Sequence, residues 1–424
     1  MKKILSLFLC CLMVLTLTGC GGSSGDDITT YTYSSELDIK NLDSSDADDG
    51  CSLKAIHAVI DGLTKTDKKG NIVNAVAKSE ELSEDGLTHT YKLRKDVKWT
   101  NGDPVTAHDF VYAWQRIFRK KGSYYYMFAD GIASIEGAQE LSDKIDAGEE
   151  LTDDDLNSMG VKAIDDYTLE VKTTVRVSFF DELMAFPCFF PINEKFCEKQ
   201  GDKYGKSAKA ILGNGAFIMT NWEPGSIAEF KKNEDYYEAK TVKIEKLVMK
   251  LVQDPKVAAQ SFMAGETDYA PITSDLVDKY KDDESFKQVP EGFLYYLSVN
   301  FQNEDLANAN IRQAVSFSIN RKDLCEKVLK DGSSAATGFI PKGVATSPDG
   351  KDFREESGTY ITYSQSKAQQ ALDRGLKELG KSEIKLRITY GTDESPMDVI
   401  ATYLQNSLSK LKGIKVEMVA TTKQ

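Results

Sequence analysis

Apolar residues recur along this chain at two spacings, one typical of strands and one typical of helices. Alternating apolar and polar residues predict a half-buried strand at residues 87–93, continued by residues 96–99. The same alternation predicts a hairpin of residues 161–164 and 167–172. A run of β-branched and aromatic residues at 28–33 predicts a first, buried strand.

Helical spacing separates these strands. Residues 53–63 carry apolar side chains three and four positions apart, which predicts a helix. Thr106 and Asp109 have the spacing of a capping box and predict the start of a second helix. Residues 136–156 are acidic and helical in pattern, with Thr152 as a predicted N-cap, and their charges indicate a solvated face.

The rest of the chain also mixes both spacings. Residues 213–231 predict a hairpin, and Asp254 with Pro255 predicts the start of a helix at 257–264. The elements predicted after it are helices at 311–319 (capped by Asn310), 324–329 (capped by Asn320), 367–379 and 399–411, and strands at 384–390 and 414–419. Strand, helix and strand in this order form a parallel crossover, so we expect a second α/β sheet.

The first twenty residues have the organisation of an export signal. Lys2 and Lys3 precede an apolar run at residues 4–16, which is shorter than the roughly 20 residues that span a bilayer. The sequence Leu-Thr-Gly-Cys ending at Cys20 resembles the bacterial lipobox, so Cys20 is expected to carry a lipid after cleavage. Residues 21–25 have the composition of a flexible tether. The alternative is an ordinary signal peptide with an incidental cysteine.

Composition excludes several classes of function. The net charge of −13 argues against a nucleic-acid partner, because phosphate binding needs clustered cations. A chain of 424 residues is too long for a single core, so two or more lobes are expected. No second stretch approaches membrane-spanning length, which leaves the lipid as the expected anchor. No nucleotide-binding or hydrolase motif occurs in the sequence, so no catalytic role is expected.

Cysteines and histidines give no sign of a metal or cofactor. None of the cysteines forms a C-x-x-C pair. The four cysteines of the expected mature body besides Cys20 allow three disulfide pairings, among which the sequence does not choose: Cys51, Cys188, Cys197 and Cys325. The three histidines are widely spaced, so we expect surface or capping roles for them: His57, His89 and His108. No metal or cofactor is therefore predicted.

Two segments are candidates for ligand contact. The acidic loop at residues 44–50 does not have the spacing of an EF-hand, and we interpret it as a solvated or ligand-contacting loop rather than a metal site. The aromatic cluster at residues 124–128 follows the second helix. It suits core packing, and it also suits the wall of a ligand cleft, where an aromatic ring offers apolar area with a polar tip.

Several phrases in the sequence resemble one protein family. They are residues 99–116 (WTNGDPVTAHDFVYAWQR), 213–237, 264–268 (AGETD), 295–301 (YYLSVNF) and 311–321 (IRQAVSFSINR). Together they resemble family 5 of the extracellular solute-binding proteins, and within it the oligopeptide-binding proteins of ABC importers. The resemblance is collinear from about residue 30 to the end of the chain.

The resemblance implies an α/β fold of the type II periplasmic-binding class, a two-lobed clamshell with an extra α+β subdomain. The implied organisation is a signal peptide (1–19), a tether (20–27), lobe I (28–62 and 186–292), an accessory subdomain (63–185) and lobe II (293–424). Relatives continue beyond this length. Lobe II is therefore expected to be truncated, without the aspartate-containing loop that pairs with the peptide's α-amino group.

Carried over by position, the resemblance implies three ligand-contacting segments. They are Asp48, Asp49, Gly50 and Cys51, which line the peptide backbone; Tyr124, Tyr125 and Tyr126, which form an aromatic wall; and Tyr295 and Tyr296, at the start of lobe II. For each tyrosine, packing in a core remains an equal alternative. Gly213, Asn214, Gly215 and Trp222 are assigned to the fold rather than to the ligand.

The predicted function is a lipid-anchored receptor on the outer face of the cytoplasmic membrane. It would capture oligopeptides and deliver them, as a monomer, to permease subunits of an ABC importer. One alternative is another ligand, such as a dipeptide, a metal chelate, an oligosaccharide or a pheromone. A second is a non-functional truncated remnant, and an exported hydrolase is disfavoured because its motifs are missing from the sequence.

Overall fold

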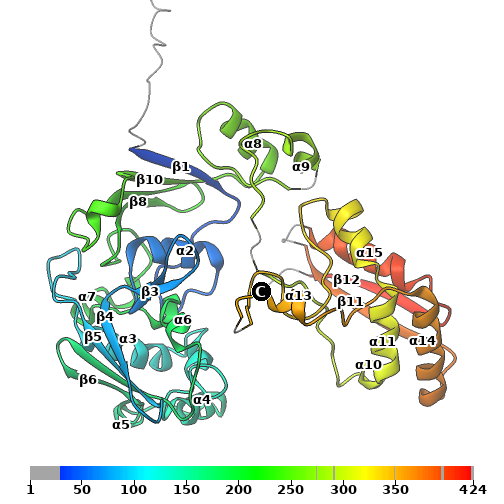
Figure 1. The fold of residues 1–424 in the computed structure, drawn as a ribbon, viewed down its shortest axis with the longest axis horizontal. Helices are drawn as coiled ribbons and strands as arrows, with labels where there is room; N and C mark the ends of the chain where they lie inside the picture. The colour runs from blue at the N-terminus through cyan, green and yellow to red at the C-terminus, as the bar shows by residue number, and fades with distance from the viewer. Residues whose placement is uncertain (1–28, 274, 290–291, 348, 393–395, 422–424) are drawn as a thin grey trace, which may run out of the picture. The chain divides into compact units, whose positions relative to one another are not determined.

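The computed structural model describes residues 29–273, 275–289, 292–347, 349–392 and 396–421 (Figure 1). The predicted signal peptide, Cys20 and the tether lie outside these residues. The chain divides into two compact units, residues 1–271 and 272–424, and each unit is described by itself. Among the described residues, none of the helices has the length and apolar character needed to cross a membrane.

The first unit alternates strands and helices in its described part. Its strands are β1 (Thr30–Ser35), β2 (Thr64–Thr66), β3 (Ile72–Asn74), β4 (Ala77–Leu82), β5 (Thr88–Leu93), β6 (Val161–Asp165), β7 (Thr168–Lys172), β8 (Phe217–Glu223), β9 (Ile227–Lys232) and β10 (Lys246–Leu251). Its helices are α2 (Gly50–Val59), α3 (Ala107–Arg119), α4 (Ala138–Asp146), α5 (Asp153–Asn157), α6 (Phe180–Met184), α7 (Glu194–Gln200) and α8 (Pro255–Met263). Short 3-10 turns are η1 (Tyr125–Phe128), η2 (Pro187–Phe189), η3 (Gly201–Lys203) and η4 (Ala239–Thr241).

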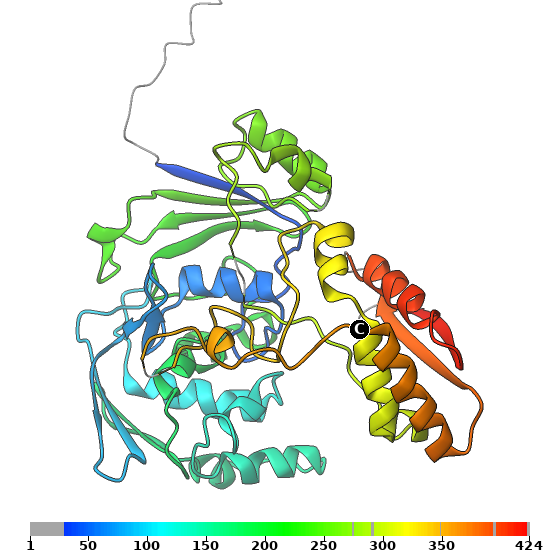
Figure 2. The same cartoon turned by 45° about the vertical axis from the view of Figure 1, so that its right-hand side comes forward.

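One sheet of this unit has the order β1-β10-β9-β8, with β1 parallel to β10 and the other neighbours antiparallel. Helix α2 lies against one face of the sheet (Figure 2). Its Ile56, together with Ile60 just after the helix, shares a core with Met219 and Phe230. The prediction of a buried first strand is wrong, because β1 lies at the edge of the sheet and Ser34 is its one buried residue.

The second sheet is antiparallel and has the order β4-β5-β7-β6. The predicted hairpin is confirmed as β6 and β7. Helix α3 covers a core that includes Trp114 and Phe118. The predicted continuation of β5 through residues 96–99 is wrong. The strand ends at Leu93, and after it the chain turns so that Trp99 can enter the core with 1% exposure.

The capping box predicted at the start of α3 is confirmed. The Thr106 N–H donates to the Asp109 carboxylate at 2.7 Å, and the Trp99 indole N–H donates to the same oxygen at 3.3 Å. Burial nevertheless raises the pKa of Asp109 to about 6, because the charged form loses its hydration. The predicted helix at 136–156 is divided into α4 and α5, and Thr152 caps α5 as expected.

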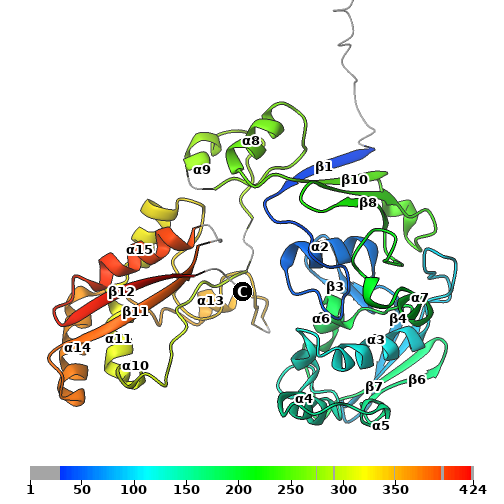
Figure 3. The ribbon, with the colours of Figure 1, turned by 180° about the vertical axis from the view of Figure 1, so that it is seen from behind.

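The second unit is smaller. Its described helices are α9 (Asp275–Tyr280), α10 (Glu304–Ala307), α11 (Ala309–Ser318), α12 (Arg321–Asp323), α13 (Phe353–Glu356), α14 (Gln365–Leu379) and α15 (Met397–Leu408), with a π-helical segment η5 (Leu324–Leu329). Its strands are β11 (Ile384–Gly391) and β12 (Ile414–Thr421). Figure 3 shows the two strands side by side.

The parallel crossover predicted for this unit is confirmed. β11 and β12 pair in parallel with Ile384 opposite Ile414, and α15 connects them. Leu372 of α14 and Ile311 of α11 belong to the same core as the strands. The predicted N-cap of α11 is wrong by two positions. Asn308 caps this helix, because its side-chain oxygen accepts the N–H groups of the second and third residues after it.

Candidate functional site

The first predicted ligand segment lies at the start of α2. Asp49 caps this helix, and its Oδ1 accepts the N–H groups of Cys51 and Ser52 at 3.1 and 2.9 Å. Asp49 therefore has a structural role, since it satisfies two of the free donors of the first helical turn. Its second carboxylate oxygen is buried and has no hydrogen-bond partner among the described residues.

Gly50 is the exposed residue of this segment around which there is free space. A Cβ atom built on Gly50 would meet nothing within 4 Å. The structure shows no acceptor for its N–H group among the described residues. An uncovered N–H at a helix N-terminus can donate to a carbonyl or carboxylate oxygen of a ligand, and the helix dipole favours such an oxygen there.

Tyr124 lies next to the same segment. Its hydroxyl donates to the Asp48 carbonyl oxygen at 3.4 Å, and its ring packs edge-on against Phe186 at 5.2 Å. Burial, and then the negative charges nearby, raise the pKa of Tyr124, so the phenol stays protonated. Tyr126, whose ring centroid is 6.2 Å from that of Tyr124, is 50% exposed. The structure thus brings Asp48, Tyr124 and Tyr126 together.

Two predicted site residues point elsewhere. The Tyr125 hydroxyl donates to Asp146 of α4 at 2.7 Å, and this hydrogen bond is the main reason that the pKa of Tyr125 is raised. The Cys51 thiol donates to the Leu37 carbonyl oxygen at 3.1 Å and lies 3.8 Å from the Met249 sulfur. Burial raises the pKa of Cys51, which argues against a reactive thiolate.

Tyr295 and Tyr296 belong to the second unit. They lie in residues 292–300, which form neither helix nor strand, and their exposed fractions are 69% and 71%. The ring of Tyr296 lies near that of Phe339, with centroids 6.3 Å apart. Within this unit, taken by itself, both side chains are largely open to solvent.

Residues of the types that bind metals are dispersed in the described part of the chain. Within the described part of the chain, no three His, Cys, Asp or Glu side chains are grouped so as to hold a metal ion. The four cysteines described are free thiols. His108 is exposed near Asp166, as expected for a surface histidine. The surface prediction is wrong for His89, which is 4% exposed and stacks on Phe180 with centroids 4.1 Å apart.

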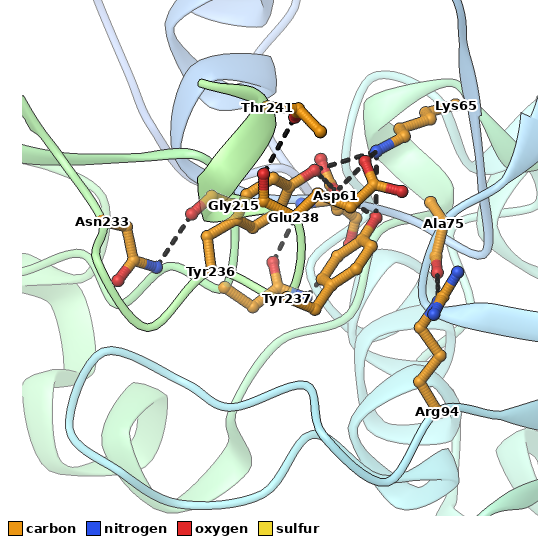
Figure 4. Close-up of polar contacts among 11 residues, drawn as sticks. Asp61, Lys65, Ala75, Arg94, Gly215, Asn233, Tyr236, Tyr237, Glu238 and Thr241 are labelled. Carbon is orange, nitrogen blue, oxygen red and sulfur yellow. Dashed lines mark hydrogen bonds and ion pairs between the residues drawn. The ribbon is translucent and has the colours of Figure 1, made fainter. Parts of the chain in front are cut away.

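A buried polar network at the other end of α2 was missed by the sequence analysis (Figure 4). The Asp61 Oδ2 atom accepts the hydroxyl groups of Tyr236 and Tyr237 at 2.6 and 2.7 Å. Lys65 donates to both phenol oxygens and pairs with Glu238. The network therefore ties the end of α2 to β2 and to the turn after β9.

The phrase at residues 213–215 packs against the same end of the helix. The Gly215 N–H donates to the Val59 carbonyl oxygen at 2.9 Å, and the Asn214 side chain bonds both backbone groups of Asp61. Asn214 is 1% exposed. A Cβ atom on Gly213 would lie 2.1 Å from the Val59 oxygen. These contacts agree with the assignment of this phrase to the fold.

Comparison with known proteins identifies the family. Residues 71–424 match the model of the bacterial extracellular solute-binding proteins, family 5. The chain belongs to this family. Its members are exported binding proteins and not enzymes.

Individual relatives agree with this membership. The chain is 32% identical to the dipeptide-binding protein DppE of Bacillus subtilis, over 87% of this chain and 65% of DppE. It is 30% identical to the oligopeptide-binding protein OppA of the same organism, over 99% of this chain and 77% of OppA. The chain thus spans a little less than two thirds of DppE.

A solved structure of a peptide-bound relative gives the same result for the fold. The structure of OppA from Listeria monocytogenes is similar with a TM-score of 0.78 and 30% identity, over 94% of this chain and 77% of that chain. The prediction of a two-lobed α/β fold of the periplasmic-binding class is thereby confirmed.

Proposed function

We propose that this protein captures oligopeptides outside the cell and passes them to the permease of an ABC importer. The observation that carries the proposal is the likeness to OppA and DppE, whose names state that they bind oligopeptides and dipeptides. In this proposal the protein acts as a monomer. Its two lobes and accessory subdomain have the residue bounds predicted from the sequence. The absence of any nucleotide-binding motif from the sequence suits a binding subunit that depends on an ATPase elsewhere.

Features of the site support a peptide as the ligand. Family members that accept varied peptides need contacts to the repeating main chain, since side chains differ from peptide to peptide. The open N–H of Gly50 offers such a contact. In the first unit, Tyr126 offers an exposed ring with a polar tip, which suits peptide side chains of varied character. In the second unit, taken by itself, Tyr295 and Tyr296 are exposed rings of the same kind. Dipeptides are the second candidate, supported by the identity to DppE.

The export signal supports a lipid anchor at Cys20, followed by the flexible tether. We expect the wild-type chain, expressed in a bacterium, to sediment with membranes and to incorporate labelled fatty acid. Cys20→Ser should remove the label and release the protein from the membrane fraction. Label retained by Cys20→Ser would contradict the assignment of the anchor.

Titration calorimetry with peptides tests the ligand and the role of Gly50 together. The body from residue 20 onward should bind tri- to pentapeptides and bind free amino acids far more weakly. Gly50→Pro removes a single N–H donor at the first helical position, where proline is tolerated. We expect it to weaken peptide binding by about tenfold, the value of one hydrogen bond.

Gly50→Ala is the matched comparison, because it adds one carbon into open space and keeps the N–H. The ratio of the two affinities isolates the N–H group. Equal affinities of the two variants would reject the role of Gly50. A well-folded wild-type protein that gives no heat with any peptide would reject the function itself.

A further inference from the structure

Asp43 and Arg116 form a buried ion pair beneath the loop that leads to Gly50. Arg116 of α3 donates from both terminal nitrogens to the two carboxylate oxygens of Asp43, at 2.7 and 2.8 Å. The side chains are 3% exposed for Asp43 and 9% for Arg116. The arginine also lies over the ring of Tyr204, 5.2 Å from its centroid. A two-point pair of this kind fixes orientation as well as distance.

Asp43 in turn organises its own loop. Its Oδ1 accepts the Ser45 N–H at 3.1 Å, and its carbonyl oxygen accepts the N–H groups of Asp46 and Ala47 at 2.9 and 2.8 Å. Residues 43–47 are therefore folded around Asp43. Asp48 follows this turn directly, and after it come Asp49, the N-cap of α2, and Gly50, the first residue of the helix.

The residues that follow α3 hold this loop at further points. A Cβ atom on Gly122 would lie 1.8 Å from the Ser45 carbonyl oxygen, so the two backbones are in direct contact. Two residues later, the Tyr124 hydroxyl reaches the Asp48 carbonyl oxygen. The same segment of chain thus supplies Arg116, the close backbone contact and the aromatic wall.

We propose that Arg116 is a positioning residue for ligand binding. Through Asp43 it fixes the turn at residues 43–47 and holds the Gly50 N–H in place before the ligand arrives. A loop that is already ordered loses less conformational entropy on binding, so the pair contributes to affinity without touching the ligand. This proposal rests on the proposed function, because it takes residues 48–51 as part of the peptide site.

Arg116→Lys tests the proposal, because lysine keeps the charge and loses the two-point geometry. We expect peptide affinity to fall about tenfold, with amide hydrogen exchange at residues 44–52 about tenfold faster in the ligand-free protein. Tyr236→Phe is the matched control. It removes a buried hydrogen bond at the far end of α2 and leaves residues 43–47 untouched.

The two measurements separate the possible outcomes. Suppose that Tyr236→Phe and Arg116→Lys lose equal stability and also lose equal peptide affinity. The loss of affinity then follows from the loss of stability in general, and the proposal is overturned. Unchanged exchange at residues 44–52 in Arg116→Lys overturns it as well, whether or not the wild type binds peptides. If exchange at residues 44–52 is faster in Arg116→Lys but the wild type binds no peptide, Arg116 does hold the loop in place. The proposed function is then rejected.

A second variant covers the case in which Arg116→Lys does not fold. The double variant Asp43→Asn/Arg116→Gln keeps the size of the side chain at position 43, shortens the one at position 116 and leaves no unpaired buried charge. We expect it to fold and to show the same faster exchange at residues 44–52, since two amides do not reproduce the charge-assisted pair. Wild-type exchange rates and wild-type affinity in this variant would overturn the proposal.

Discussion

Gly213→Ala is expected to destabilise the protein by about 3 kcal/mol, because the added carbon would meet a backbone atom that cannot move aside. The Cβ position lies 2.1 Å from the Val59 carbonyl oxygen. That oxygen also accepts the Gly215 N–H, so a shift of the chain would break a hydrogen bond. Chemical denaturation of both proteins, followed by far-UV circular dichroism, measures the difference.

Gly50→Ala is the control for this comparison. It makes the same chemical change at a position where the new carbon meets nothing within 4 Å. Its stability should lie within about 0.5 kcal/mol of the wild type. If the two alanine variants were equally stable, the packing of residues 213–215 against the end of α2 would be wrong.

Asp61→Ala is expected to destabilise the protein by about 2–4 kcal/mol, because two phenol hydroxyl groups lose their acceptor at about 1–2 kcal/mol each. Its carboxylate accepts two phenol hydroxyls, and its loss leaves buried Tyr236 and half-buried Tyr237 without that acceptor. Lys65 would keep Glu238 as its partner. Thermal and chemical denaturation of the intact chain would measure the effect.

The loss of stability caused by Tyr236→Phe is the reference with which the loss caused by Asp61→Ala is compared. It removes one of the two hydroxyl donors and leaves the carboxylate bonded to Tyr237. We expect it to cost about 1–2 kcal/mol. A cost for Asp61→Ala no larger than that for Tyr236→Phe would show that the carboxylate does not organise the network.

Local signals predicted the elements that depend on local chemistry. The capping residues Thr106 and Thr152 mark the starts of α3 and α5, because an N-cap needs nothing beyond its own turn. The alternating pattern of β11 and β12, with a helix between them, was enough to predict that the two strands pair in parallel. The prediction of Asn310 as the N-cap of α11 failed, because Asn308, two positions earlier, satisfies the same sequence rule.

Contacts between residues far apart in the chain could not be predicted from the sequence. Asp61 and Tyr236 are far apart in the chain, and neither residue type signals a buried network. The same holds for Asp43, which lies just before the predicted loop at residues 44–50, and for Arg116, which lies within a predicted helix. For each tyrosine of the aromatic cluster, the resemblance left core packing and ligand contact equally open. The structure separates Tyr125, bonded to Asp146, from Tyr126, which is half exposed.

The most direct test of the central claim is to identify what the protein carries when it leaves a cell. The full chain would be purified from a secreting host without added ligand and then denatured, and the released molecules would be analysed by mass spectrometry. We expect a mixture of short peptides of varied sequence, in an amount approaching one per protein molecule. A single non-peptide solute at that stoichiometry would contradict the claim.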